Sequence, residues 1–568
     1  MKKSLLYSSI VGLGLLASGC NDFLDKNPDN RSDITDKTKV DALLVSAYNP
    51  KTNMTLLSPR CDYMTDNGAT FRGSQPSATF DYVLSGFLWD EYTKTESGND
   101  SYEQFWTGSY QAIAAANQAL ASIEQIGGGK EYASARAEAL ICRAYNHFTL
   151  LTMFSNMFDR DNMSSNLGIP YVKEPENVVI KRYERGTVAG TLTEVMADFQ
   201  EGLKNIGGPG DYKQPKFHFT RDAANAFGVR LSLYTEDYAA AINYASSLIP
   251  TVNENNLRPL QNKGKPVVNA NGDTALYVVP TDAAVQFCLM NMHDWNEIAK
   301  NAGGSDGMGM EFSGAEASSN LLVSECMTTI ERATSGTLYV RHGINTATLR
   351  AMMSNASGAP TLLPAFGYSG DPSLILPKFY EDFKITSSSG GITTGVAYAK
   401  IPLLRLEEVL LGRAEAYAML GQFQSALNDL NMWYKLRADA DAGYSEAENT
   451  VYRDGLIRAY GSAINSSDHF INSSINSARF SDLSDENDIQ FRKALILAIL
   501  DARNVEFLQE GIRYFDILRW NIPVTHRTAD GKSSTLTYDD DRRVIQLPES
   551  VTLSDVEPNP WNPKDSWK

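Results

Sequence analysis

Apolar side chains recur at steps of three and four residues over much of the chain, which is the spacing of one face of an α-helix. The first clear stripe contains Trp106, Tyr110, Ile113 and Ile123. A run of glycines at 127–129 predicts the end of this helix. A second helix is expected over about 132–157, so the two predict an antiparallel helix pair joined by a short loop.

The same periodicity predicts further helices over 187–206, 220–234 and about 491–510. Two other turns share one layout, because Tyr238 and Phe423 are each followed by alanine after three residues and by an aliphatic residue after four. An aromatic ring at the turn and a small residue where paired helices touch are typical of tetratricopeptide-type repeats. We therefore predict a mainly α fold built from tetratricopeptide-like helix pairs.

Residues 250–400 differ in composition from these helical stretches. They are rich in Gly, Ser, Asn, Thr and Pro, with short strand-like runs such as 275–279 embedded in them. Long loops in a compact protein are usually functional or mobile. We expect an irregular, loop-rich region with a few short strands here, and another polar loop over 462–488.

The N-terminus predicts export and a lipid anchor. Lys2 and Lys3 precede an apolar stretch over 5–16, which is too short to cross a membrane as a mature helix. Small residues at 17–19 then lead to Cys20, which fits a lipoprotein cleavage site with Cys20 acylated. The alternative is an ordinary secretory signal with a chance cysteine. We expect a signal peptide over 1–19 and a lipid-anchored tether over 20–40.

Composition narrows the classes of function. The chain has 568 residues, with 51 Lys+Arg against 68 Asp+Glu, and its net charge is −17. Nucleic acid and anionic lipid both require clustered basic residues, so we expect no nucleic-acid partner. The cysteines after Cys20 form no C-x-x-C pair, and we expect small buried thiols, although a disulfide at Cys61 stays open.

No motif for catalysis or cofactor binding is found in the sequence. The glycines at 127–129 lack P-loop spacing, and no H-E-x-x-H or G-x-S-x-G occurs. The paired carboxylates of a glycosidase are matched in space and not in sequence, so a hydrolase stays open as an alternative. We expect no catalytic residue, no cofactor and no metal site.

Four stretches together resemble the SusD/RagB family of surface nutrient-binding lipoproteins. They are Cys20 to Asp25 with Pro28, the helix pair with Arg143-Ala144-Tyr145 and a later Gly168-Ile169-Pro170, the run from Ile401 to Ala416, and the run from Arg503 to Trp520. Their charged residues lie among apolar neighbours on expected helices. We predict ion networks that pin helices together, and not a ligand site, for Arg405, Glu415, Glu506, Arg513, Asp516 and Arg519.

The resemblance implies a partner and a ligand. Proteins of this family dock on a SusC-like TonB-dependent transporter in the outer membrane and help capture glycan, or in some members peptide. Sugars need flat aromatic rings for their C–H faces and planar polar groups for their hydroxyls. The ligand-binding residues expected in the loops are Trp89, Tyr82, Trp295 and Asn296, with Asp66, Asn67 and Arg72 in the N-terminal loop. For each aromatic ring the alternative is packing beneath a loop.

We therefore expect a non-catalytic lipoprotein of the outer membrane, facing the outside, that captures oligosaccharide and delivers it to the transporter. The alternatives are the same fold binding peptides, a surface hydrolase, or a purely structural partner of the barrel. We expect an N-terminal helical region over 41–260 and a C-terminal region over 261–568, interleaved into one body.

Overall fold

The computed structural model describes two long parts of the chain and several short pieces between them. They are residues 34–68, 70–71, 75–76, 81–92, 98–176, 182–250, 257, 267–268, 274–275, 319–330, 341–345, 348, 351–352, 366–367, 374–375, 379, 381–389, 392–437, 451–564 and 567. Cys20, Arg72, Trp295 and Asn296 lie outside the described residues. The described part is mostly helical, which confirms the predicted fold class.

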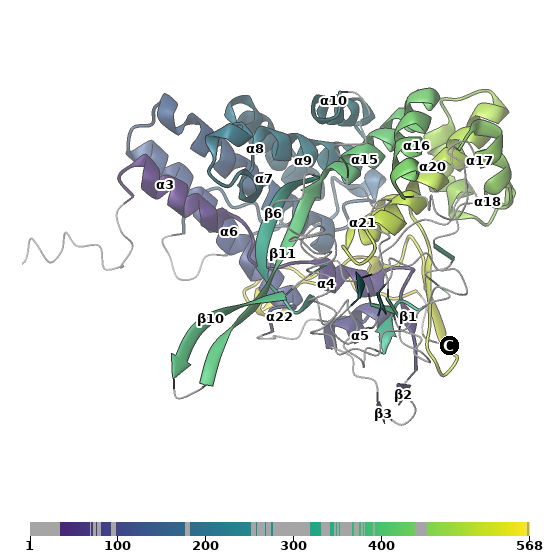
Figure 1. Ribbon diagram of the computed structural model, residues 1–568, viewed down its shortest axis with the longest axis horizontal. Helices are drawn as coiled ribbons and strands as arrows, with labels where there is room; N and C mark the ends of the chain where they lie inside the picture. The colour runs from purple at the N-terminus through teal and green to yellow at the C-terminus, as the bar shows by residue number, and fades with distance from the viewer. Residues whose placement is uncertain are drawn as a thin grey trace, which may run out of the picture.

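The predicted first helix pair is α6 (Tyr102–Gln125) with α7 (Ala133–Phe154). Gly127 and Gly128 both have positive φ in the turn between them, which is why glycine suits these positions. α3 (Lys37–Leu44) packs beside this pair, as Figure 1 shows.

A third long helix, α8 (Val188–Asn205), packs closely against α7. A Cβ atom at Gly202 would lie 2.7 Å from a side-chain carbon of Ile141, so only glycine permits this approach. These helices lie together with α3 at one end of the molecule (Figure 1).

The two turns with a shared layout each join a helix pair. The first pair is α9 (Arg221–Tyr234) with α10 (Tyr238–Leu248), and the second is α15 (Leu406–Met419) with α16 (Phe423–Arg437). The alanine three residues after each aromatic ring is fully buried. Because α10 also packs on α15, the pairs stack on one another as repeat units do.

Two further helices complete the part that we call the helical half. They are α20 (Glu486–Glu506) and α21 (Ile512–Arg519). The helical half thus consists of the helices α6, α7, α8, α9, α10, α15, α16, α20 and α21. The prediction of a polar loop over 462–488 is wrong in part. After α17 (Arg453–Ala459), this stretch contains the short helices α18 (Gly461–Asn465) and α19 (Ser474–Ser477). The side chain of Ser473 accepts a hydrogen bond from the Asn476 N–H and caps α19, so polar residues here support a helix.

The run from Ile401 to Ala416 is half strand and half helix. β11 (Ile392–Arg405) ends where α15 begins. The expectation that Arg405 lies on a helix is therefore wrong, because Arg405 is the last residue of the strand. Pairing with β6 keeps the chain extended as far as Arg405, which explains why the helix starts only at Leu406.

β11 is the central strand of an antiparallel sheet whose order is β10-β11-β6, with β10 (Glu381–Ser389) and β6 (Asn320–Met327). With 14 residues it is longer than the runs expected in this region. Figure 1 shows β10 and the first part of β11 projecting from the body as an arm. The other strands pair in twos: β1 (Thr65–Asp66) with β7 (His342–Gly343), β2 (Thr70–Phe71) with β3 (Gln75–Pro76), β4 (Val267–Val268) with β5 (Thr274–Ala275), β8 (Phe366–Gly367) with β9 (Leu374–Ile375), and β12 (Val524–Arg527) with β13 (Ser533–Leu536).

We call the remaining part the loop-rich half. It comprises β1, β7, β12, β13 and the short helices α4 (Met54–Leu57), α5 (Asp81–Leu88) and α22 (Glu549–Thr552) with their connections. One cluster of buried apolar side chains, from Val40 to Val556, includes residues of both halves. Within the described ranges, none of the helices is both long and apolar enough to cross a membrane.

The predicted ion networks between helices are confirmed for Glu415, Glu506, Asp516 and Arg519. Arg513 instead pairs with Asp62 outside the helices, and Arg405 pairs with Glu510 from the end of β11. Arg519 on α21 donates to both carboxylate oxygens of Glu415 on α15, at 2.5 and 2.6 Å, and to Asp516 at 2.9 Å. Arg503 on α20 donates to Asp516 at 2.9 Å, and these four side chains are at most 4% exposed. Burial raises the pKa of Asp516, but the guanidinium groups of Arg503 and Arg519 outweigh it and lower that pKa.

Candidate functional site

Four of the predicted ligand-binding residues are described, and all four lie in the loop-rich half. Asp66 ends β1 and Asn67 follows it, while Tyr82 lies on α5 and Trp89 directly after it. β7 connects the two groups, because His342 lies 3.9 Å from Asp66 and its ring centroid lies 4.6 Å from that of Phe87 on α5. The loop-rich half thus brings together residues that are far apart in the sequence.

Asp66 is the centre of a polar clamp. Arg341 donates to its two carboxylate oxygens, each at 2.6 Å, and the backbone N–H groups of Gly68 and Ala529 add bonds of 2.9 Å. Burial raises the pKa of Asp66, but these hydrogen bonds outweigh it and lower the pKa to about 2. The carboxylate therefore ties β1, β7 and the β12–β13 turn together, and its oxygens are already occupied by donors.

The side chains beside the clamp are more accessible than Asp66 itself. The Asp66 side chain is 0% exposed, whereas that of Arg341 is 32% exposed. Asn67 is partly exposed, its backbone N–H donates to the Arg341 carbonyl oxygen at 2.9 Å, and its side-chain oxygen accepts from Thr65 at 3.3 Å. Both Asp66 and Asn67 are partly exposed as residues, but the Asp66 side chain is fully covered.

An aromatic stack lies next to the clamp. The His526 ring stacks on Phe87 and on Trp89, with ring centroids 4.4 Å apart in both pairs. Its Nδ1 atom lies 2.7 Å from the Phe87 carbonyl oxygen, and its Nε2 atom lies 2.8 Å from that of Cys61. Burial lowers the pKa of His526, while hydrogen bonds to the two carbonyl oxygens oppose this. The His526 side chain thus connects β12 to α5 and to Cys61, which follows α4 in the chain.

The predicted aromatic platform residues are buried in this stack or beside it. Trp89 is 1% exposed and Tyr82 is 6% exposed, so both occupy the packing position that was the alternative for each ring. Trp89 also has a positive φ of 52°, which is costly for a bulky residue and is held in place by the surrounding contacts. Neither ring offers a free face to a sugar in this structure.

Trp567 is the ring that sequence reasoning missed. Its centroid lies 6.1 Å from that of Phe87 and 6.2 Å from that of Trp89, and its Nε1–H donates to the Leu88 carbonyl oxygen at 3.2 Å. Unlike the rings beneath it, Trp567 is partly exposed. A signal was present, because a tryptophan in a polar, proline-rich tail has few apolar neighbours of its own and needs a surface to pack on.

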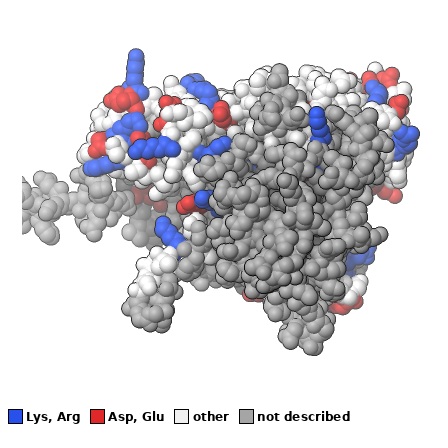
Figure 2. Space-filling view, in the orientation of Figure 1, with Lys and Arg blue, Asp and Glu red and all other residues white. Residues whose placement is uncertain are grey.

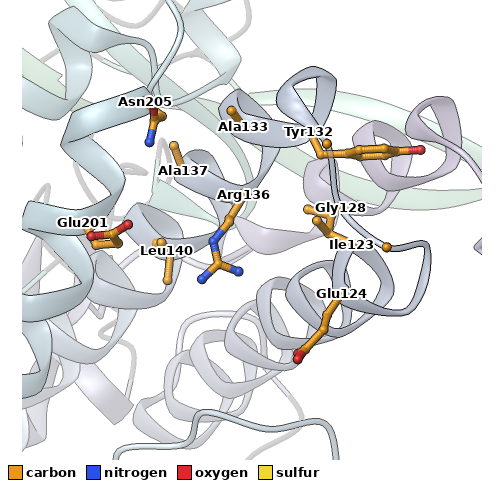
Figure 3. A pocket seen from close by; sticks show the side chains of 12 residues that line it. Ile123, Glu124, Gly128, Tyr132, Ala133, Arg136, Ala137, Leu140, Glu201 and Asn205 are labelled. Carbon is orange, nitrogen blue, oxygen red and sulfur yellow. The ribbon is translucent and has the colours of Figure 1, made fainter.

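A separate cavity of about 440 Å³ lies in the helical half, between α6, α7 and α8 (Figure 3). Apolar side chains of Ile123, Ala137 and Leu140 line it, and Arg136 points between Glu124 and Glu201. The ring of Tyr132, 8% exposed, points away from Arg136. The cavity has planar polar groups but lacks an open aromatic face, which sugar stacking requires.

Metal and thiol chemistry receive no support from the described residues. No group of three or more His, Cys, Asp and Glu side chains that could hold a metal ion lies among them. Cys61, the cysteine for which a disulfide stayed open, is free and buried, as are Cys142 and Cys326. Burial raises the pKa of the Cys61 thiol, so it is a poor nucleophile.

Comparison with known proteins gives two family matches along this chain. The profile described as "Starch-binding associating with outer membrane" (SusD-like) matches residues 22–233, and the profile described as "SusD family" (SusD/RagB) matches residues 375–550. The gap between the two matches, residues 234–374, contains most of the stretch over 250–400 that was expected to be rich in loops. No curated protein matches the chain significantly.

Solved structures share the fold at low sequence identity. A SusD superfamily protein from Bacteroides fragilis is 15% identical, with a TM-score of 0.56, and the match covers 93% of this chain and 100% of that one. A SusD superfamily protein from Bacteroides vulgatus is 16% identical, with a TM-score of 0.54 and coverage of 92% and 98%. A SusD-like carbohydrate binding protein from Bacteroides vulgatus is 13% identical, with a TM-score of 0.54 and coverage of 91% and 96%.

Proposed function

The chain belongs to the SusD/RagB family, and from this premise we propose a non-catalytic lipoprotein that captures oligosaccharide at the cell surface. Cys20 carries the lipid anchor in the outer membrane. The captured oligosaccharide passes to a SusC-like TonB-dependent transporter. The chain is a SusD-like binding protein, and its ligand class, anchor and partner are the parts that we propose.

The observation that carries the ligand class is the aromatic stack capped by a partly exposed ring. Trp567 is partly exposed, and its ring lies near those of Phe87 and Trp89, which fix its position. A rigid ring loses little conformational entropy when a pyranose stacks on it. Asn67 and Arg341 supply a planar amide and a guanidinium in the same half.

The remaining predicted residues complete the proposed site. Arg72, Trp295 and Asn296 belong to segments outside the described residues, and we propose that they contact the ligand from those segments. Trp89 and Tyr82 act from beneath as support, and Asp66 fixes the clamp that positions Asn67.

The state of Asp66 supports a function without catalysis. A general acid needs a pKa near the working pH, whereas donors to the Asp66 carboxylate hold its pKa at about 2. The buried carboxylates of Glu415 and Asp516 are likewise engaged by arginines. Paired with arginines in this way, these carboxylates serve the structure.

Affinity electrophoresis in gels that contain soluble polysaccharides tests the proposal. Trp567→Ala is expected to reduce retention about tenfold, equivalent to about 1.4 kcal/mol, on any gel that retards the wild type. Trp561→Ala is the matched control, because it removes a partly exposed tryptophan from the same tail. Equal retention of Trp567→Ala and the wild type would contradict the site.

The same protein separates the alternative functions. Glycans incubated with it should yield no shorter products, and any turnover would support the hydrolase instead. If calorimetry gives heat with peptides but not with glycans, the ligand class is wrong. If no ligand gives heat while the transporter co-purifies, the protein is a structural partner of the barrel.

A further inference from the structure

The projecting arm carries an open strand edge. β11 pairs with β10 over residues 392–399 and with β6 over residues 398–405. Because the order is β10-β11-β6, these two strands lie on opposite edges of β11. β6 pairs with one edge of β11 only over residues 398–405. Along the same edge over residues 392–397, no residue that the structure describes pairs with β11. Among the described residues, the projecting arm is therefore a ribbon of two strands, β10 and the first part of β11 (Figure 1).

Specific contacts turn β6 away from this place. The Met327 N–H donates to the Pro50 carbonyl oxygen at 2.9 Å. The hydroxyls of Thr328 and Thr329 and the Thr329 N–H each donate to the buried carboxylate of Asp100 at 2.7 Å. β6 therefore ends because residues 327–329 are bound elsewhere, and among the residues that the structure describes none takes the place of β6 beside residues 392–397.

The arm lacks the usual protection of an exposed edge. Natural edge strands carry charges, prolines or bulges that prevent pairing with other chains. Residues 385–399 contain no Lys, Arg, Asp or Glu, and Ile385 is 61% exposed. Figure 2 shows the described atoms of the arm as mainly uncharged. A register shift between Ile385 and Ser387 is the one protective irregularity within the described β10–β11 ladder.

We propose that the open edge of β11 over residues 392–397 binds an extended, uncharged segment of the transporter, which adds a strand in line with β6. The inference rests on the proposed function, which supplies the transporter as the partner. Only a polypeptide backbone matches the alternating N–H and C=O groups of a strand edge. Neutral side chains are expected in that segment, since a charge packed against this arm would lose water without gaining a partner.

The added strand has a defined direction and a physical benefit. Since it continues the ladder of β6, it runs antiparallel to β11. A two-stranded ribbon is marginally stable in water, and a third strand removes this weakness. The arm thereby becomes a docking element that is separate from the Trp567 site.

Co-purification of the full-length lipidated protein with its co-expressed transporter tests this proposal. In a shortened arm, an Asn-Gly turn replaces residues 384–396 and joins the paired residues Phe383 and Ala397. We expect at least tenfold less transporter to be recovered, with unchanged retention in polysaccharide gels. Because the β6–β11 pairing lies outside the deleted residues, the sheet at the base of the arm remains.

Paired lysine substitutions assign the edge. Thr394→Lys with Val396→Lys places charges on the strand with the open edge, and about tenfold less transporter is expected. Thr386→Lys with Ser388→Lys places the same charges on exposed positions of β10, and less than a twofold change is expected. Circular dichroism of both variants checks that the fold is retained.

The outcomes distinguish this inference from the proposed function. If the shortened arm recovers as much transporter as the wild type, the inference is overturned and the function stands. Equal losses from the two lysine pairs would overturn the assignment to β11. If the wild type binds glycan but recovers no transporter, delivery to the transporter fails and the inference fails with it.

Discussion

The helical half and the loop-rich half hold buried charge in different ways. In the helical half, several of the arginines and carboxylates on α15, α20 and α21 bind more than one partner. Asp516, for example, accepts hydrogen bonds from both Arg503 and Arg519. In the loop-rich half, a single side chain joins separate segments, as Asp66 does for β1, β7 and the β12–β13 turn. The first arrangement is a network, and the second is a set of individual clamps.

This difference separates stability from ligand binding. Loss of a network charge leaves another buried charge without its partner inside the main core, so it affects the whole fold. Loss of a clamp frees one or two loop segments while the helix pairs remain packed. The scaffold can therefore stay fixed while the loops around Trp567 vary in position and sequence.

The largest expected effect is in the network. Arg519→Met leaves Glu415 buried without its arginine partner, and we expect a loss of about 3–5 kcal/mol in the free energy of unfolding. Urea unfolding followed by circular dichroism measures it. Arg182→Met is the control, because its ion pair with Asp555 has side chains 81% and 61% exposed and is worth at most about 1 kcal/mol. Similar losses in both variants would contradict the larger contribution expected of the buried network.

The network could be predicted from the sequence, whereas the clamps could not. Glu415, Asp516 and Arg519 lie among apolar neighbours on expected helices, so their charges imply buried partners. The partners of Asp66 come from residues 341 and 529, and no periodicity relates such distant segments. For the same reason the sequence identified Trp89 as an important ring but could not show that Trp567 would cover it.

The second effect is in the Asp66 clamp and depends on pH. The pKa of Asp66 is about 2 in the folded protein against about 3.9 unfolded, so its contribution is present above pH 4 and is lost as pH falls towards 2. At pH 6 we expect Asp66→Asn to lower the free energy of unfolding by about 1–2 kcal/mol, after allowance for solvent screening around Arg341.

Urea unfolding between pH 6 and pH 2 measures this difference. The gap between wild type and variant should close as pH falls, since the asparagine of the variant has no charge to lose. Burial lowers the pKa of His342 to about 4, and the Asp66 charge 3.9 Å away opposes this, so Asp66→Asn also changes the titration of His342. The pH dependence of the gap therefore reports on the coupled pair of Asp66 and His342. A gap that stays constant with pH would show that the carboxylate charge contributes nothing.

A smaller effect is expected at the aromatic stack. His526→Phe keeps a flat ring between Phe87 and Trp89 but removes both contacts to carbonyl oxygens. We expect a loss of about 1 kcal/mol in the free energy of unfolding. Hydrogen exchange should show faster exchange in β12, with α20 unchanged. Faster exchange throughout the helical half would mean that this clamp is part of the network.

The smallest expected effect concerns the cavity of the helical half. Arg136 is exposed and makes no ion pair within 4 Å among the described residues, so Arg136→Ala should change the free energy of unfolding by less than about 0.5 kcal/mol. Retention in polysaccharide gels should also stay at the wild-type value, because the cavity lacks an open aromatic face while the loop-rich half has Trp567. If retention is lost with Arg136→Ala and kept with Trp567→Ala, the sugar binds between α6, α7 and α8. The helical half would then be both scaffold and binding site, and the division of roles between the two halves would be wrong.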